Sequence, residues 1–230
     1  MSLRAIIRIM KVTIDQYVVY RLNFILWRVR VVLNFLIVFF LWSSIYSNRT
    51  NALGYSKDEM ITYVLAINVV SAIVLSSKAM EVAALIRSGD IINFLLKPIS
   101  FFAYLLTQEA VDKVVNIAFS VVEISLIVLI FKPHFFIPHS LVNILLAFLF
   151  ISIGVTLYFF IELGISALSF WVADIWSARF VFWVLVSVLA GTMFPLNILP
   201  APVFQLLLFT PFPYLVYVPI QVYIGTSSLP

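Results

Sequence analysis

Between Arg30 and Arg49 stands the uncharged run VVLNFLIVFFLWSSIYSN, residues 31–48. An α-helix rises 1.5 Å per residue, so about 20 residues cross the ~30 Å hydrocarbon core of a bilayer. The run is close to that length. Its apolar residues are continuous, whereas a strand of a membrane β-barrel alternates polar and apolar residues. The run therefore predicts a membrane-spanning helix.

The composition of the whole chain agrees with this interpretation. The 230 residues are 64% hydrophobic and only 10% charged, and the mean hydropathy is +1.15. Soluble domains carry roughly 25% charged residues. Lipid leaves only helices or closed barrels as spanning structures, because backbone groups must be hydrogen-bonded internally. We predict an all-α integral membrane protein forming a single transmembrane domain over 1–230. The chain has no cysteine, which excludes disulfides and thiolate chemistry.

Four more spans follow from the sparse charges. They are expected within 60–77, 114–131, 141–162 and 180–194. No charged residue occurs from Phe180 to Pro230, but six prolines subdivide that stretch. Because proline removes a backbone hydrogen bond and clashes with the preceding turn, we expect 195–224 to be a proline-broken segment. It would be re-entrant or form a sixth span.

Lysine and arginine residues indicate the orientation. With the N-terminus inside, eleven of them lie on the cytoplasmic side and three outside, which the positive-inside rule favours. The cytoplasmic set is Arg4, Arg8, Lys11, Arg21, Arg28, Arg30, Lys78, Arg87, Lys97, Lys113 and Arg179. The outer set is Arg49, Lys57 and Lys132. The net charge of +4 is thus explained by membrane orientation and not by a nucleic-acid partner. We expect a multi-pass protein of a cell membrane, the inner membrane of a bacterium.

Two segments on the cytoplasmic side have their own patterns. Residues 3–18 place apolar side chains at helical spacing and charged ones on another face, so we expect an amphipathic helix in the membrane interface over 3–27. Residues 80–98 read MEVAALIRSGDIINFLLKP. Gly89 suits the position after a helix end, Asp90 suits the N-cap of a next helix, and Pro98 closes it. This segment is expected to be two short helices joined by a sharp turn.

Four stretches together resemble the permease subunits of ABC-2 type transporters, and within them an uncharacterised bacterial group often encoded as paired permeases beside an ATPase. They are GYSKDEMITYVLA (54–66), IRSGDIINFLLKPIS (86–100), ALSFWVADIW (167–176) and PLNILPAPVFQLLLFTPFPYLVYVPIQVYIG (195–225). Their order and spacing carry the resemblance over nearly the whole chain. Family members usually continue past the YIG motif into a last apolar span and a basic tail, so this chain looks truncated or unusually short.

The resemblance implies an amphipathic N-terminal helix, six spans, and a cytoplasmic coupling segment that fits a groove on the nucleotide-binding subunit. On this sequence the coupling residues are Arg87, Ser88, Gly89, Asp90, Phe94 and Lys97. The implied partners are a separate ABC ATPase subunit and a second permease, either another copy or a paralogue. The implied function is that of the permease in an ATP-driven exporter.

Enzymatic motifs are missing from the sequence. There is no GxxxxGK[ST], GxSxG or HExxH, and the six glycines are too dispersed to cradle a phosphate. We therefore expect no enzyme activity and no cofactor. His134 and His139 are too few ligands, without clustered acids, for a metal site.

Two carboxylates, Glu123 and Glu162, fall inside expected spans. Intramembrane ionisable groups are costly and often functional. Glu123 is a candidate proton relay or cargo contact, or else a neutral acid bonded to a serine or threonine. Glu162 is expected near the cytoplasmic end of its span, where water reaches it. Two alternatives to the exporter remain: an ion-coupled secondary transporter using Glu123, and a scaffold without transport. The apolar lining favours an amphipathic or lipid-like cargo.

Overall fold

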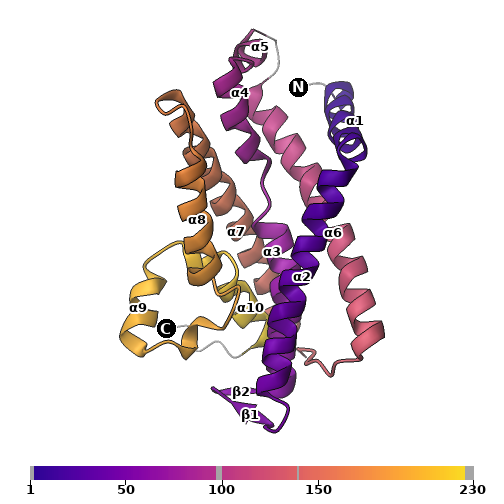
Figure 1. Cartoon of the computed structure of the whole chain (residues 1–230), viewed down its shortest axis with the longest axis vertical. Coiled ribbons are helices and arrows are strands. Elements are labelled where there is room, and N and C mark those ends of the chain that lie inside the picture. The colour runs from indigo at the N-terminus through magenta and orange to yellow at the C-terminus, as the bar shows by residue number, and fades with distance from the viewer. Residues whose placement is uncertain (1–2, 97–99, 139, 226–230) are drawn as a thin grey trace.

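The structure, a computed structural model, describes residues 3–96, 100–138 and 140–225 and is helical apart from one small hairpin (Figure 1). In chain order the elements are α1 (Leu3–Val19), α2 (Arg21–Ile45), β1 (Asn51–Ala52), β2 (Tyr55–Ser56), α3 (Lys57–Val74), η1 (Lys78–Glu81), α4 (Val82–Ser88), α5 (Ile91–Leu95), α6 (Phe101–Phe131), α7 (Leu141–Ala167), η2 (Leu168–Phe170), α8 (Trp176–Leu189), η3 (Leu196–Ile198), α9 (Ala201–Leu208), η4 (Phe212–Tyr214) and α10 (Tyr217–Ile224). The strands β1 and β2 pair antiparallel.

Three of the described helices are long and apolar enough to cross a membrane. These are α2, α6, and α7 continued through η2 to Phe170. A fourth candidate is α3 taken together with η1 and α4, which continue it at an angle of 45°. The all-helical membrane architecture is thus confirmed, with three or four candidate spans.

The fifth expected span, 180–194, differs from its prediction. The helix there is α8, which has 14 residues and is about 21 Å long at 1.5 Å per residue. It ends where Gly191 adopts φ +79°, and a Cβ there would lie 2.9 Å from the Tyr63 hydroxyl. Tyr63 donates a hydrogen bond of 2.8 Å to the Gly191 carbonyl. This tight contact with α3 turns the chain before the helix reaches the length of a crossing.

The N-terminal boundary also differs from its prediction. The interfacial helix was expected over 3–27, but α1 ends at Val19 and a new helix, α2, starts at Arg21. Residues 21–27 therefore belong to the first span. Tyr20 lies at the break with φ −96° and ψ 31°. The break lets α1 turn away and pack along α6.

The core is centred on α3, which packs against α2, α6, α7 and α10. Met60, Tyr63 and Val64 on this helix are completely buried. Most of α3 is buried against the surrounding helices, whereas α2 and α6 keep many exposed apolar side chains.

The proline-rich stretch 195–224 is made of short pieces. Its two α-helices, α9 and α10, have eight residues each. Nearly all of α10 is buried against α7 and α3. A Cβ on Gly154 of α7 would lie 3.3 Å from the Tyr214 carbonyl, so the absence of a side chain lets this backbone approach closely.

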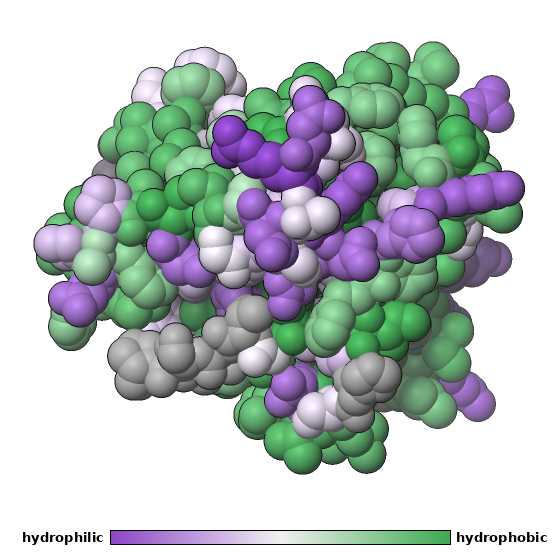
Figure 2. All heavy atoms as spheres, turned by 90° about the horizontal axis from the view of Figure 1, so that it is seen from below, coloured by the Kyte–Doolittle hydropathy of each residue, from purple (hydrophilic) through white to green (hydrophobic). Residues whose placement is uncertain are grey.

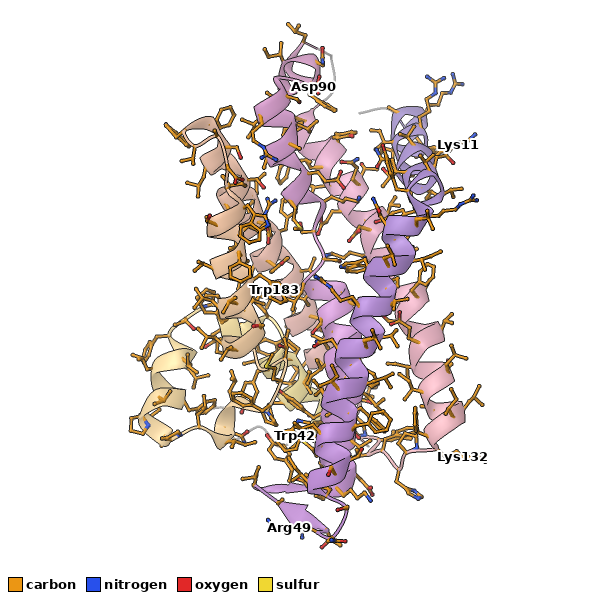
Figure 3. All side chains as sticks on the ribbon, viewed as in Figure 1. Lys11, Trp42, Arg49, Asp90, Lys132 and Trp183 are labelled. Carbon is orange, nitrogen blue, oxygen red and sulfur yellow. The ribbon has the colours of Figure 1, made fainter. Side chains whose placement is uncertain are left out.

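Polar residues gather at the two ends of the bundle. Lys11 and Asp90 lie at the end that carries α1, α4 and α5, called here the α4 end (Figure 3). Arg49 and Lys132 lie at the opposite end, called the hairpin end. Viewed from the hairpin end, many hydrophilic residues gather near the centre and hydrophobic ones cover much of the remaining face (Figure 2). This distribution suits a multi-pass membrane protein.

Candidate coupling site

The predicted coupling residues form a tight turn between α4 and α5. Gly89 adopts the left-handed conformation, φ +77°, and its N–H donates to the Ile86 carbonyl at 3.1 Å. The Ser88 hydroxyl donates to a carboxylate oxygen of Asp90 at 2.6 Å. Asp90 itself is helical, at φ −64° and ψ −16°, and its side chain makes no cap hydrogen bond. Asp90 therefore stands at the N-cap position of α5, as predicted, but its carboxylate is bonded to Ser88 and Asn93 and does not cap the helix.

The turn is exposed and lies at the far tip of the α4 end (Figure 3). Arg87, Ser88, Gly89 and Asp90 are all solvent-exposed. Arg87 reaches Asp174, in the loop before α8, at 3.9 Å. Both of these side chains are largely exposed, so the pair is worth less than ~1 kcal/mol. The four residues form a polar surface, which we call the tip.

The predicted coupling residue Phe94 is not at the tip. The Phe94 ring packs against α6, with ring centroids 4.7 Å from Tyr104 and 5.5 Å from Phe101. Phe94 thus fastens α5 to α6. Lys97 lies outside the described residues, as does His139 of the histidine pair.

The coupling segment begins at η1, which we call its base. On one side, this base is held by Glu109 of α6, whose side chain is buried, with 6% of the residue exposed. One of its carboxylate oxygens accepts from the Ser77 hydroxyl at 3.1 Å and from the Lys78 backbone N–H at 2.8 Å. The other oxygen lies 2.9 Å from Lys113 Nζ. Glu109 therefore neutralises the N-terminal end of η1, where free backbone N–H groups favour a negative charge. Glu109 is not among the residues predicted from the sequence, although the spacing of four between Glu109 and Lys113 is typical of a helical ion pair.

On the other side, the base is held by Arg179 of α8 and Ser166 of α7. Arg179 Nη2 donates to the Met80 carbonyl at 3.1 Å and to the Ser166 hydroxyl at 3.0 Å. The Ser166 hydroxyl donates to the Ala79 carbonyl at 2.8 Å. These bonds tie η1 to two different helices.

Glu162 lies next to Arg179 and is buried. It is 2% exposed, and its carboxylate lies 3.6 Å from Arg179 Nε. The expectation of a water-accessible Glu162 is therefore wrong. It is one helical turn before Ser166, on the same face of α7, so η1 and Arg179 cover both residues.

Glu123 also has a different partner from the one expected. Its carboxylate lies 2.7 Å from Arg28 Nη2 and accepts from Arg28 Nε at 2.8 Å. The expectation of a neutral acid bonded to a serine or threonine is wrong, because the long arginine side chain reaches it from α2. Arg28 is 6% exposed, so this arginine does not face headgroups.

A polar network continues from this ion pair to α1. Arg28 Nη1 donates to Asn116 Oδ1 at 3.2 Å, and Asn116 Nδ2 donates to Asp112 Oδ2 at 3.1 Å. Asp112 also accepts from the Tyr17 hydroxyl. Burial and the Asp112 carboxylate raise the pKa of Tyr17 above its usual range, so the phenol stays a donor. The helices α1, α2 and α6 are thereby joined near the base of the coupling segment.

The sequence comparison decides the family. Residues 32–230 match the model of the family described as ABC-2 family transporter protein. The chain is a member of the ABC-2 transporter family. No curated protein and no solved structure gives a significant match. The family match confirms the resemblance and includes both sides of the coupling site, whereas α1 lies before the matched residues.

Proposed function

We propose that this ABC-2 family protein is the permease subunit of an ATP-driven exporter whose ATP is hydrolysed by a separate ABC ATPase subunit. The observation that carries the proposal is the exposed tip, residues 87–90, at the end of a two-helix segment whose base is fixed to three helices. An exposed polar turn offers a partner surface, and a buried base transmits displacement.

Movement would pass from the tip to the spans along two routes. Glu109 connects the base of the segment to α6. Ser166 and Arg179 connect it to α7 and α8. Because these helices lie on different sides of η1, displacement of the segment would shift α6 relative to α7 and α8. In the assembled exporter, a second permease copy or a paralogue would provide the other half of the transport path.

The orientation belongs to the proposal. The α4 end would face the cytoplasm of a bacterial cell, with the N-terminus inside, since ten lysines and arginines besides the buried Arg28 are assigned to that side against three. The short helix α8 and the broken segment 195–224 would complete the fifth and sixth membrane passages together with neighbouring protein.

The ion pairs that Glu123 and Glu162 form with arginines favour an ATP-driven exporter over an ion-coupled secondary transporter. Among the described residues, both intramembrane candidates, Glu123 and Glu162, lie against an arginine. A carboxylate held in an ion pair is a poor proton carrier, because giving it a proton would leave a buried arginine unpaired. An amphipathic or lipid-like cargo, moved along apolar helix surfaces, would not need a charged relay.

Site-directed cross-linking tests the proposal. The cysteine-free chain allows a single cysteine at Ser88, and a matched control at Leu53, an exposed residue of the hairpin end. In membranes that contain the co-expressed ATPase, a short cross-linker should join the ATPase to the variant with cysteine at 88 and not to the control. Equal cross-linking from both positions, or from neither, would contradict the assignment of the tip.

A further inference from the structure

A cavity of about 550 Å³ lies between the end of α1, the start of α2, η1 and α6. One wall is aromatic and includes Tyr17, Tyr20, Phe24 and Trp27. The lining also includes one basic and one acidic side chain, Lys78 and Glu81. None of the coupling contacts described above fills this space.

The two charged residues give the cavity a net charge of zero and a fixed polarity. Lys78 Nζ lies 2.6 Å from Glu81 Oε1 and 5.0 Å from the centre of the Tyr17 ring. The Lys78 side chain is 13% exposed, and that of Glu81 is 51% exposed. A purely anionic ligand would be repelled by Glu81, and a purely cationic one by Lys78. A ligand with both charges would match both side chains.

The cavity lies at the level of lipid headgroups. Trp27 lies near the start of α2 and Tyr46 directly follows its end, and the 19 residue steps from one to the other rise roughly 28 Å, about the thickness of a hydrocarbon core. Tryptophan and tyrosine prefer the two membrane interfaces. The neighbouring α1 keeps Leu3, Ile7 and Val18 exposed, as an interfacial helix does. These positions put Trp27, and therefore the cavity, at the interface of the α4 end.

We propose that this cavity binds the headgroup of a zwitterionic phospholipid that carries an ammonium group. The lipid phosphate would lie beside Lys78. The ammonium would donate to Glu81 and contact the aromatic wall, where a cation is attracted to ring faces. Entry of the headgroup would exchange the Lys78–Glu81 bridge for two bonds to the lipid. This proposal rests on membrane insertion and not on the exporter function.

The site has a consequence for the coupling segment. Lys78 and Glu81 are the first and last residues of η1, at the base of that segment. Tyr20 lies at the break between α1 and α2, and Trp27 lies near the start of α2. A bound headgroup would link these two parts of the protein and hold α1 against η1.

Native mass spectrometry of the full chain tests the proposal. The protein is reconstituted with equal amounts of phosphatidylethanolamine and phosphatidylglycerol, and the lipids retained after transfer to detergent are counted. We expect one phosphatidylethanolamine to be retained at least about 5-fold more often than phosphatidylglycerol. Glu81→Gln and Tyr20→Ala should each reduce that retention about 5-fold, since each removes one contact of the ammonium. Controls that remove an acid or an aromatic ring elsewhere, Asp58→Asn and Phe209→Ala, should retain the lipid.

Preference for phosphatidylglycerol, or unchanged retention in variants that fold with the normal melting temperature, would overturn the proposal. A separate arm identifies the source of the headgroup. If soluble phosphoethanolamine stabilises the protein against heat as strongly as a short-chain phosphatidylethanolamine does, the occupant is a soluble molecule and the lipid assignment is wrong. Should either variant fail to fold, Lys78→Met replaces it. This variant removes the proposed contact with the lipid phosphate and should likewise reduce the retention of phosphatidylethanolamine.

Discussion

Arg28 of α2 and Glu123 of α6, 95 residues apart in the sequence, form an ion pair of 2.7 Å within the bundle. Their side chains are 7% and 10% exposed. Removing one partner of such a pair leaves an uncompensated buried charge, whereas replacing both with apolar residues of similar volume is often nearly neutral. The pair should therefore behave as a unit.

The first prediction compares a single and a double variant at this pair. Glu123→Gln should destabilise the protein by ~3 kcal/mol, because Arg28 stays buried beside a neutral amide. The double variant Arg28→Met and Glu123→Leu should be close to wild type. Unfolding in detergent measures both. If Glu123→Gln is as stable as wild type, the ion pair does not hold α2 to α6 in the membrane.

The second prediction concerns orientation. Single cysteines at Asp90 and at Leu53 lie on exposed residues of opposite ends. A membrane-impermeant maleimide added to intact cells should label position 53 and leave position 90 unlabelled until the cells are opened. The reverse pattern would invert the orientation and place the tip outside, beyond the reach of a cytoplasmic ATPase.

A third prediction concerns the α6 side of the coupling base. Glu109→Ala removes the acceptor of the Lys78 N–H and the partner of Lys113. Losing a buried acceptor costs about 1–3 kcal/mol, so amide exchange at residues 78–81 should become at least about 10-fold faster. Glu109→Gln keeps one acceptor oxygen and should have a smaller effect. Exchange rates equal to wild type in Glu109→Ala would show that Glu109 does not fix the segment.

The helices and turns that depend only on neighbouring residues in the sequence could be predicted. The uncharged runs of α2, α6 and α7 follow from composition alone. The turn at Gly89 follows from the preference of glycine for positive φ. These features need no knowledge of distant residues.

Features that depend on contacts between distant residues were missed. The early end of α8 depends on Tyr63 packing against Gly191. The partner of Glu123 is an arginine that the sequence analysis assigned to the cytoplasmic interface. Glu109 was overlooked because it lies near the border of a span, where a charge is unremarkable, and only the fold brings η1 to it.

We propose that an ATPase moves the membrane spans by displacing the turn at Gly89, and two glycines allow a matched test. Gly89 and Gly54 both have positive φ, +77° and +84°, and a Cβ at either would meet open space. They lie at opposite ends of the protein. Proline cannot adopt positive φ, so it strains both turns in the same way.

The decisive measurement is stimulation of the ATPase by the purified permease reconstituted with its ATPase subunit. The Gly89→Pro variant should insert normally and yet reduce stimulation to the level of the ATPase alone, because the tip loses its shape. The Gly54→Pro variant should keep full stimulation. Undiminished stimulation by a normally inserted Gly89→Pro variant, or an equal loss in both variants, would contradict the account.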